Sequence, residues 1–358
     1  MKKLNAYISA SVGNSILMVL LVLLGLDFIA AIIDEMGLVS DQYPFTGVLR
    51  YALFSIPGNV FDLLPFAALV GALAGLGSLA ANSELVVMRS AGVATARIAW
   101  MVVRPVLVIL LSGMLISEFV APHTETIAQG DRAIALRSDS SIVSRDGLWH
   151  REGNDFMHFN VVQASGVLYG VSIYSYDAQR QLRSTLYAQR AIFQADHWLL
   201  EDYSRSTLSA LDVGSGVVAQ QTGLSTSWDT ALSPALLNIL VLDPIDLSIK
   251  GLWDYSKYLD GQGLNSGRYK LAFWEKVLQP LATVSLVLIA VSFVFGPLRE
   301  VTMGFRIFVG VLFGVVFRTG QDLLTPASLV YGFSPIYASL IPIVICLLIG
   351  SWFLRGKS

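Results

Sequence analysis

The sequence of 358 residues is 54% hydrophobic and only 14% charged, and its formal net charge is −2. Soluble globular domains carry about 25% charged residues, so this composition indicates a membrane protein. The small negative charge gives no reason to expect nucleic-acid binding. The one cysteine, Cys346, cannot form an intramolecular disulfide, so packing must hold together any domain outside the cytoplasm.

Six apolar segments are long enough to cross a bilayer, which takes roughly 20 residues of helix. The first follows Lys2 and Lys3, as in a signal peptide, but it has no small-residue cleavage site and is predicted to be a retained helix. The second is interrupted by Pro57 and Pro65. The segments cover residues 12–33, 53–80, 96–120, 269–295, 304–324 and 335–354.

The region between the third and fourth segments is different in kind. Polar residues return at 138–235, and in 155–163 the side chains of Met157, Phe159 and Val161 fall on one face of an extended chain. Similar runs at 170–176, 186–193 and 197–208, with a turn at 177–181, predict a β-sandwich or jelly roll. An amphipathic stretch at 247–259 predicts a helix that leads back to the membrane.

These elements predict an α-helical membrane protein with six transmembrane helices and an inserted all-β, jelly-roll-like domain. Residues 1–122 contain the first three helices and a short helix at 83–91. Residues 123–265 form the extramembrane region, and residues 266–358 contain the last three helices.

Basic residues predict the orientation, because cytoplasmic loops carry an excess of lysine and arginine. Arg50 is the one basic residue near the ends of the 1–2 and 5–6 loops, where Asp34, Glu35 and Asp41 also lie. Both termini, the 2–3 loop and the 4–5 loop are therefore expected in the cytoplasm, and the β-domain outside. The residues that mark the cytoplasmic side are Lys2, Lys3, Arg89, Arg97, Arg299, Arg355 and Lys357.

No pattern of a catalytic site is found in the sequence. It contains no G-x-x-x-x-G-K-[ST] for nucleotide, no H-E-x-x-H and no G-x-S-x-G. The histidines match no common metal-site spacing, so ordinary strand and loop histidines are favoured over a metal site. They are His123, His150, His158 and His197.

The loop between the second and third helices predicts a contact surface. Ser83 can cap a short helix, Glu84 suits its positive end, and Gly92 suits the position after it. Exposed apolar residues in a loop usually mark a contact. Two interpretations remain open: a helix seated in a cytoplasmic ATPase, with Glu84 facing a basic residue, or a helix lying on the membrane. The helix carries Leu85, Val86, Val87, Met88 and Arg89.

The stretch 83–92 strongly resembles the coupling helix of the LptF/LptG family, the permease pair of the lipopolysaccharide-export ABC transporter. Further matches, in order along the chain, are EFVAP at 118–122, GLWH at 147–150, KVLQP at 276–280, FGPL at 295–298 and YG at 331–332. The resemblance implies a permease subunit that takes lipopolysaccharide from the outer leaflet of the inner membrane and passes it toward the outer membrane.

The resemblance also implies the partners. They are an LptF-like permease as heterodimer, an LptB-like ATPase dimer and an LptC-like single-span protein. ATP is used by the partner ATPase, so this chain is expected to be non-catalytic and to bind no cofactor. The location implied is the inner membrane of a Gram-negative bacterium, with the β-domain in the periplasm.

Two pairs of glycines at helical spacing let helices approach closely. For Gly71 and Gly75, packing within this subunit is favoured over a dimer seam. For Gly310 and Gly314 the two interpretations are balanced, because the resemblance places the first and fifth helices at the subunit interface.

Charges within membrane spans are functional candidates, because burying them in lipid is costly. Lys276 and Arg318 fall in the outer parts of their helices, and Arg132 and Arg137 lie just above the third. These four could bind the phosphates of lipid A. Alternatively, Asp27 pairs with Lys276 or Arg318 and fixes the packing.

One departure from the family concerns the outer end of the first helix. Relatives can carry lysines there that contact the lipopolysaccharide head group, whereas this chain has Asp34 and Glu35.

Two other classes of function also remain open. A membrane enzyme acting on lipid or peptide would need a catalytic signature, and a structural or sensory protein would leave the apolar loop unexplained.

Overall fold

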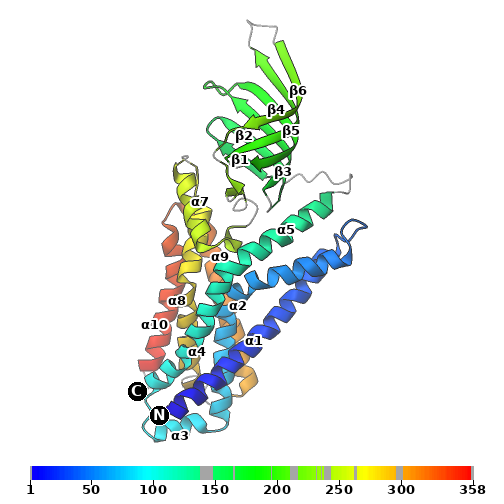
Figure 1. The fold of residues 1–358 in the computed structure, drawn as a ribbon. Helices are drawn as coiled ribbons and strands as arrows, with labels where there is room; N and C mark the ends of the chain where they lie inside the picture. The colour runs from blue at the N-terminus through cyan, green and yellow to red at the C-terminus, as the bar shows by residue number, and fades with distance from the viewer. Residues whose placement is uncertain are drawn as a thin grey trace.

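The structure is a computed structural model with a helical bundle at one end and a β-sheet at the other (Figure 1). The short helix α3 (Glu84–Ser90) and both chain ends lie at the end of the bundle that is farthest from the sheet. The residues described are 2–137, 148–163, 166–194, 196–209, 217–230, 232–234, 236–237, 243–261, 264–295 and 301–355.

Within the described residues, six helices are long and apolar enough to cross a membrane, which confirms the six predicted spans. The helices extend beyond the predicted ends, because the helical backbone satisfies its own hydrogen bonds past the apolar stretch. Helix α2 has 37 residues and is about 55 Å long, whereas the hydrocarbon layer of a bilayer is roughly 30 Å thick. The helices are α1 (Lys2–Met36), α2 (Phe45–Ala81), α4 (Thr95–Leu115) continued by η1 (Ile116–Val120) and α5 (Ala121–Arg137), α8 (Gly267–Phe295), α9 (Met303–Tyr331) and α10 (Pro335–Arg355).

The helix α2 is the centre of the bundle, and glycines bring its neighbours close. A Cβ at Gly71 would lie 2.5 Å from the Cα of Ile16 in α1, and a Cβ at Gly75 would lie 3.0 Å from the Cα of Val12. The glycines of α9 also face α2: Gly310 lies against Leu73, and Gly314 lies against Phe66. Both pairs therefore allow close packing within this subunit.

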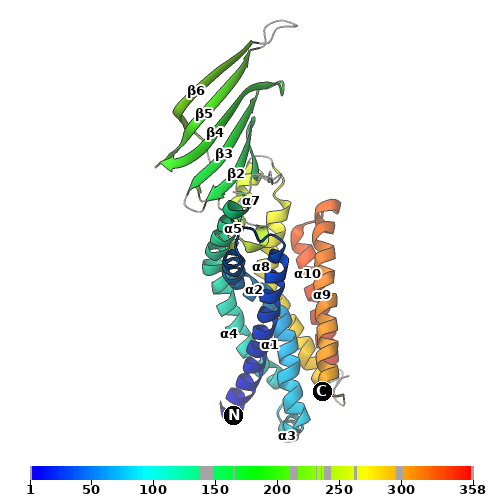
Figure 2. The same ribbon diagram turned by 90° about the vertical axis from the view of Figure 1, so that its right-hand side faces the viewer.

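The described part of the β-domain is one antiparallel sheet of six strands that neighbour each other in chain order (Figure 2). The described residues therefore form a meander, whereas a jelly roll alternates between two sheets. The strand predicted at 155–163 has the same bounds in the structure, and the strands predicted at 170–176, 186–193 and 197–208 are present and longer. The strands are β1 (Leu148–Glu152), β2 (Asp155–Gln163), β3 (Val167–Tyr176), β4 (Leu182–Gln194), β5 (His197–Ser209) and β6 (Val217–Trp228).

One face of the sheet holds the core of the β-domain. Phe159, Val171 and Trp198 are fully buried there, as alternation predicts. The core also includes Leu232 and Leu237 from the segment after β6, and the indole N–H of Trp198 donates to the Leu232 carbonyl at 2.8 Å. The chain after the last strand therefore covers the face that a second sheet would cover in a sandwich.

The predicted return helix is α7 (Ile249–Gly261), which follows the short helix η2 (Pro244–Asp246). Its apolar side, with Leu252 and Tyr255, is buried next to Tyr269 and Ala272 of α8. Figure 1 shows α7 between the helical bundle and the β-sheet. The return helix therefore lies where the two parts of the molecule meet.

The close approach at Gly71 can be tested by adding one methyl group. Gly71→Ala should destabilise the protein by about 1–3 kcal/mol, because the new Cβ would clash with the backbone of α1. Gly25→Ala in α1 is the matched control, because nothing lies within 4 Å of its Cβ position. Thermal unfolding in detergent measures both variants, and equal transition temperatures would contradict the packing described.

Candidate functional site

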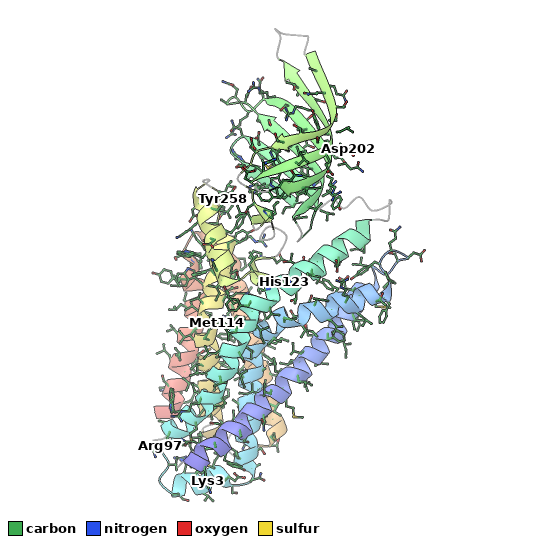
Figure 3. The ribbon with its side chains drawn as sticks, in the orientation of Figure 1. Lys3, Arg97, Met114, His123, Asp202 and Tyr258 are labelled. Carbon is green, nitrogen blue, oxygen red and sulfur yellow. The ribbon has the colours of Figure 1, made fainter. Side chains whose placement is uncertain are left out.

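The short helix α3 lies at the end of the bundle that carries the termini, where Figure 3 also labels Lys3 and Arg97. Its end is as predicted: Gly92 has φ +83°, its N–H donates to the Arg89 carbonyl, and the Val93 N–H donates to the Met88 carbonyl. This is a Schellman motif. Its beginning differs from the prediction, because the backbone of Ser83 has a left-handed conformation with φ 60°. The Ser83 side chain makes no capping hydrogen bond.

The two faces of α3 have different surroundings. Leu85 and Met88 are buried in the core of the bundle, whereas Val86 and Val87 are 51% and 64% exposed. The carboxylate of Glu84 accepts a hydrogen bond from the hydroxyl of Tyr7 in α1 at 3.1 Å. The bundle thus holds α3 by one face and presents the other face outward.

A groove of about 450 Å³ lies between α3 and the C-terminal end of α8. It is lined by Val86 and Arg89 on one side and by Val294 and Phe295 on the other. The guanidinium of Arg89 lies 5.9 Å from the ring centroid of Phe295. This cation–π contact links α3 to α8.

At the opposite end of the bundle, Lys276 is the centre of a buried polar cluster. Its side chain is on α8 and only 5% exposed, and its ammonium donates to the Ser117 hydroxyl at 3.1 Å and to the Leu247 carbonyl at 2.7 Å. The carboxyl groups of Asp62, Asp246 and Glu118 also act on it electrostatically. Its ammonium is therefore hydrogen-bonded within the chain, as a buried polar group requires.

A small polar cavity of about 60 Å³ adjoins this cluster. Burial raises the pKa of Asp246, which lies in η2 outside the spans, to about 7, and the neighbouring carboxyl groups of Glu125 and Asp62 add to this effect. The cavity is too small for a lipid head group, but it keeps polar side chains of three helices together. Its polar lining includes Asp62, Glu275, Lys276, Gln279, Arg318 and Asp322.

The other predicted phosphate ligands are paired with carboxylates. Arg132 binds Glu35 through two contacts of 3.0 Å, and Arg318 binds Asp322 at 3.2 Å on the surface. Asp27 accepts a hydrogen bond from the Asn59 amide at 2.6 Å, so the structure does not show the alternative pairing of Asp27 with Lys276 or Arg318. The side chain of Arg137, at the end of α5, lies outside the described residues.

Prolines within the helices lead to hydrogen bonds between helices that the sequence did not predict. Pro65 has no N–H, so the carbonyl of Phe61 lacks its partner within α2. The amide of Gln279 in α8 donates to this carbonyl at 2.5 Å. In the same way Pro105 frees the Met101 carbonyl, which accepts a hydrogen bond from Ser9 of α1 at 2.9 Å.

The described residues contain no group of three or more His, Cys, Asp and Glu side chains that could hold a metal ion. His150 of β1 lies 3.3 Å from the hydroxyl of Tyr258 in α7, and His197 lies beside Asp196. Several residues of the sequence motifs fall outside the described part of the chain. They are Gly147, Arg299, Lys357 and residues 296–298.

Comparison with known proteins covers nearly the whole chain. A family model described as lipopolysaccharide export system permease LptF/LptG matches residues 6–356. The chain is similar to the lipopolysaccharide export system permease protein LptG of Escherichia coli K12, with 38% identity over 99% of this chain and 98% of the relative. The LptG protein of Haemophilus influenzae is 33% identical over the same shares. The sequence SELVVM at 83–88 also resembles LptG more than LptF.

The contact between Gln279 and the carbonyl freed by Pro65 can be tested by restoring the missing donor. Gln279→Leu should lower stability by about 1–3 kcal/mol, because it leaves a buried carbonyl unsatisfied. Adding Pro65→Ala should recover part of this loss, because residue 65 then supplies an N–H to the Phe61 carbonyl. Thermal unfolding of the single and double variants in detergent measures the effect, and additive losses would contradict the assignment.

Proposed function

The chain belongs to the LptF/LptG family of lipopolysaccharide export permeases, and on that premise we propose that it moves lipopolysaccharide with energy from a separate ATPase. It is a multi-pass protein of the inner membrane with six apolar helices. The observation that carries the proposal is α3, which presents Val86 and Val87 at the end opposite the β-domain. This chain itself performs no hydrolysis and binds no nucleotide in the proposal.

The proposed orientation places both termini and α3 in the cytoplasm and the β-domain in the periplasm. Lys3 and Arg97 support it, because they lie at the α3 end and cytoplasmic ends are rich in basic residues (Figure 3). An ATPase dimer similar to LptB then contacts the exposed face of α3, with Glu84 facing a basic residue of that partner. Tyr7 holds the Glu84 carboxylate in position and connects this contact to α1.

The partner in the membrane is an LptF-like permease, which we place against α1 and α9. These two helices have the most exposed apolar surface among the six spans. An LptC-like single-span protein would join at the same seam. In α1 the exposed residues include Leu17, Met18 and Leu21, and in α9 they include Phe308, Leu312 and Val316.

The phosphates of the substrate are proposed to contact Arg132, Arg137 and Arg318 but not Lys276. Arg132 and Arg318 are partly or largely exposed, and each could exchange its carboxylate partner for a phosphate. Lys276 is buried and already has two acceptors within the chain. Substrate contact through Lys276 would require the helices around it to open, because its side chain is only 5% exposed.

Glu84→Arg tests the ATPase contact. We expect loss of ATP-driven lipopolysaccharide release from proteoliposomes and weaker co-purification of the ATPase, because a cation would then face a basic surface. Asp229→Arg, the same change at an exposed acid of the β-domain side, should behave as wild type. The purified chain alone should hydrolyse no ATP. Unchanged release with Glu84→Arg would contradict the assignment of α3.

Arg132→Ala tests the phosphate contact. It should reduce the lipopolysaccharide retained by the purified complex about tenfold or more, the size of a lost charge-assisted hydrogen bond pair. Glu35→Gln should retain at least as much lipid as wild type, because it removes the carboxylate that competes for Arg132. Mass spectrometry of the bound lipid measures both. Equal loss in the two variants would show that the Arg132–Glu35 pair serves only to hold the helices.

A further inference from the structure

The beginning of α7 is fixed to the long helix that contains α4, η1 and α5. The carboxylate of Glu118 in η1 accepts hydrogen bonds from the backbone N–H groups of Ile249 at 2.7 Å and Lys250 at 3.3 Å. The first N–H groups of a helix have no partner within it, and a negative charge is favourable there. The Ser248 hydroxyl caps the Gly251 N–H at 3.0 Å, and Glu118 supplies the acceptors for the two N–H groups before it.

Lys276 joins the same two segments to α8. Its ammonium contacts Ser117, the neighbour of Glu118 in η1, and the carbonyl of Leu247, two residues before α7 begins. Lys276 and Ser117 are each only 5% exposed. We call these residues, Lys276, Ser117 and Glu118 with the backbone of Leu247 and Ile249, the outer anchor.

The π-helical turn of η1 gives this anchor its geometry. A π-helical turn has an i→i+5 hydrogen bond, and such turns often occur at functional sites. Here residues 116–120 adopt it within one otherwise α-helical segment from Thr95 to Arg137. Ser117 contacts α8 and Glu118 contacts α7, so this turn directs two successive side chains to two different helices.

The other part of α7 contacts the β-domain. The ring of Tyr258 stacks on that of His150 in β1, with centroids 6.1 Å apart, and its hydroxyl lies 3.3 Å from the imidazole Nε2. Burial lowers the pKa of His150, which favours the neutral ring that can share this hydrogen bond. Figure 3 shows Tyr258 on α7 just below the sheet. Nine residues, about 14 Å of helix, separate Tyr258 from Ile249.

We propose that α7 sets the position of the β-domain over the membrane helices, and that Lys276, Glu118 and Tyr258 are positioning residues for lipid transfer. The proposal rests on the proposed function in lipopolysaccharide export. The outer ends of α4 and α8 hold α7, and α7 holds β1, so a displacement of these two helices moves the β-domain with them. Lipid that leaves the membrane cavity then meets the β-domain in a fixed place.

The experiment uses the full transporter complex in proteoliposomes and measures two rates, ATP hydrolysis and lipopolysaccharide release. Lys276→Met keeps an unbranched side chain, one atom shorter, but removes its donors, and it should lower the lipid released per ATP about tenfold. Tyr258→Phe removes only the hydroxyl and should lower this ratio about threefold. Hydrolysis itself should stay near wild type in both. Lys276 lies about 28 Å along α8 from Phe295, which contacts α3, and Tyr258 lies on α7 near the sheet (Figure 3).

Two variants serve as controls. Lys250→Met makes the same change at an exposed lysine of α7 whose side chain is not part of the outer anchor, and it should release lipid as wild type does. Glu118→Gln keeps one oxygen acceptor for the α7 amides and should retain more of the lipid released per ATP than Glu118→Leu. A residue that only stabilises the fold would lower hydrolysis and release together.

A distance measurement tests the mechanical claim directly. Spin labels at Leu224 in β6 and Val108 in α4, both exposed, report the position of the sheet relative to the bundle, after Cys346 is replaced by serine. Lys276→Met and Tyr258→Phe should broaden this distance distribution. Unchanged release per ATP in both variants, or a parallel fall in hydrolysis, would overturn the proposal. A wild-type complex that hydrolyses ATP but releases no lipopolysaccharide would instead contradict the proposed function.

Discussion

Polar groups within the membrane must find their partners inside the protein, and this constraint explains most of the specific contacts in the bundle. Pro65 in α2 and Pro105 in α4 each free a carbonyl, and Gln279 and Ser9 on neighbouring helices satisfy these two. Arg306, which is buried, donates to the Gly77 carbonyl near the end of α2. Each of these contacts joins two different helices, so satisfying the backbone also fixes how the helices pack.

The sequence predicts the elements well where one physical signal dominates. Six apolar runs of sufficient length identify the spans, and alternation identifies β2 to β5. The strand β6 was missed, because it is an edge strand of mostly polar residues with Leu224 83% exposed. The capping role predicted for Ser83 was also wrong, because its backbone has a left-handed conformation that no local sequence pattern predicts.

The candidate site could be predicted only in part, because its contacts join distant residues. The residue types of α3 indicate a contact surface, and the structure adds which face is exposed. The partners of the charged residues have no local signal: Arg132 and Glu35 are 97 residues apart, and Lys276 and Ser117 are 159 apart. A charge in a span looks the same in sequence whether it binds a ligand or a neighbouring helix, so only the fold separates Lys276 from the exposed arginines.

The helix α8 is the element that contacts both functional ends of the molecule. Near one end, Lys276 holds the start of α7 and the π-helical turn, and at the other end Phe295 contacts Arg89 of α3. These two residues are about 28 Å apart along the helix, close to the thickness of the hydrocarbon layer. Most of the residues between them are buried, and Gln279 ties α8 to α2, the centre of the bundle. A movement imposed at α3 therefore has a packed and continuous route to α7 that does not depend on the exposed faces of α1 and α9, which leaves those faces free to contact a partner or the lipid.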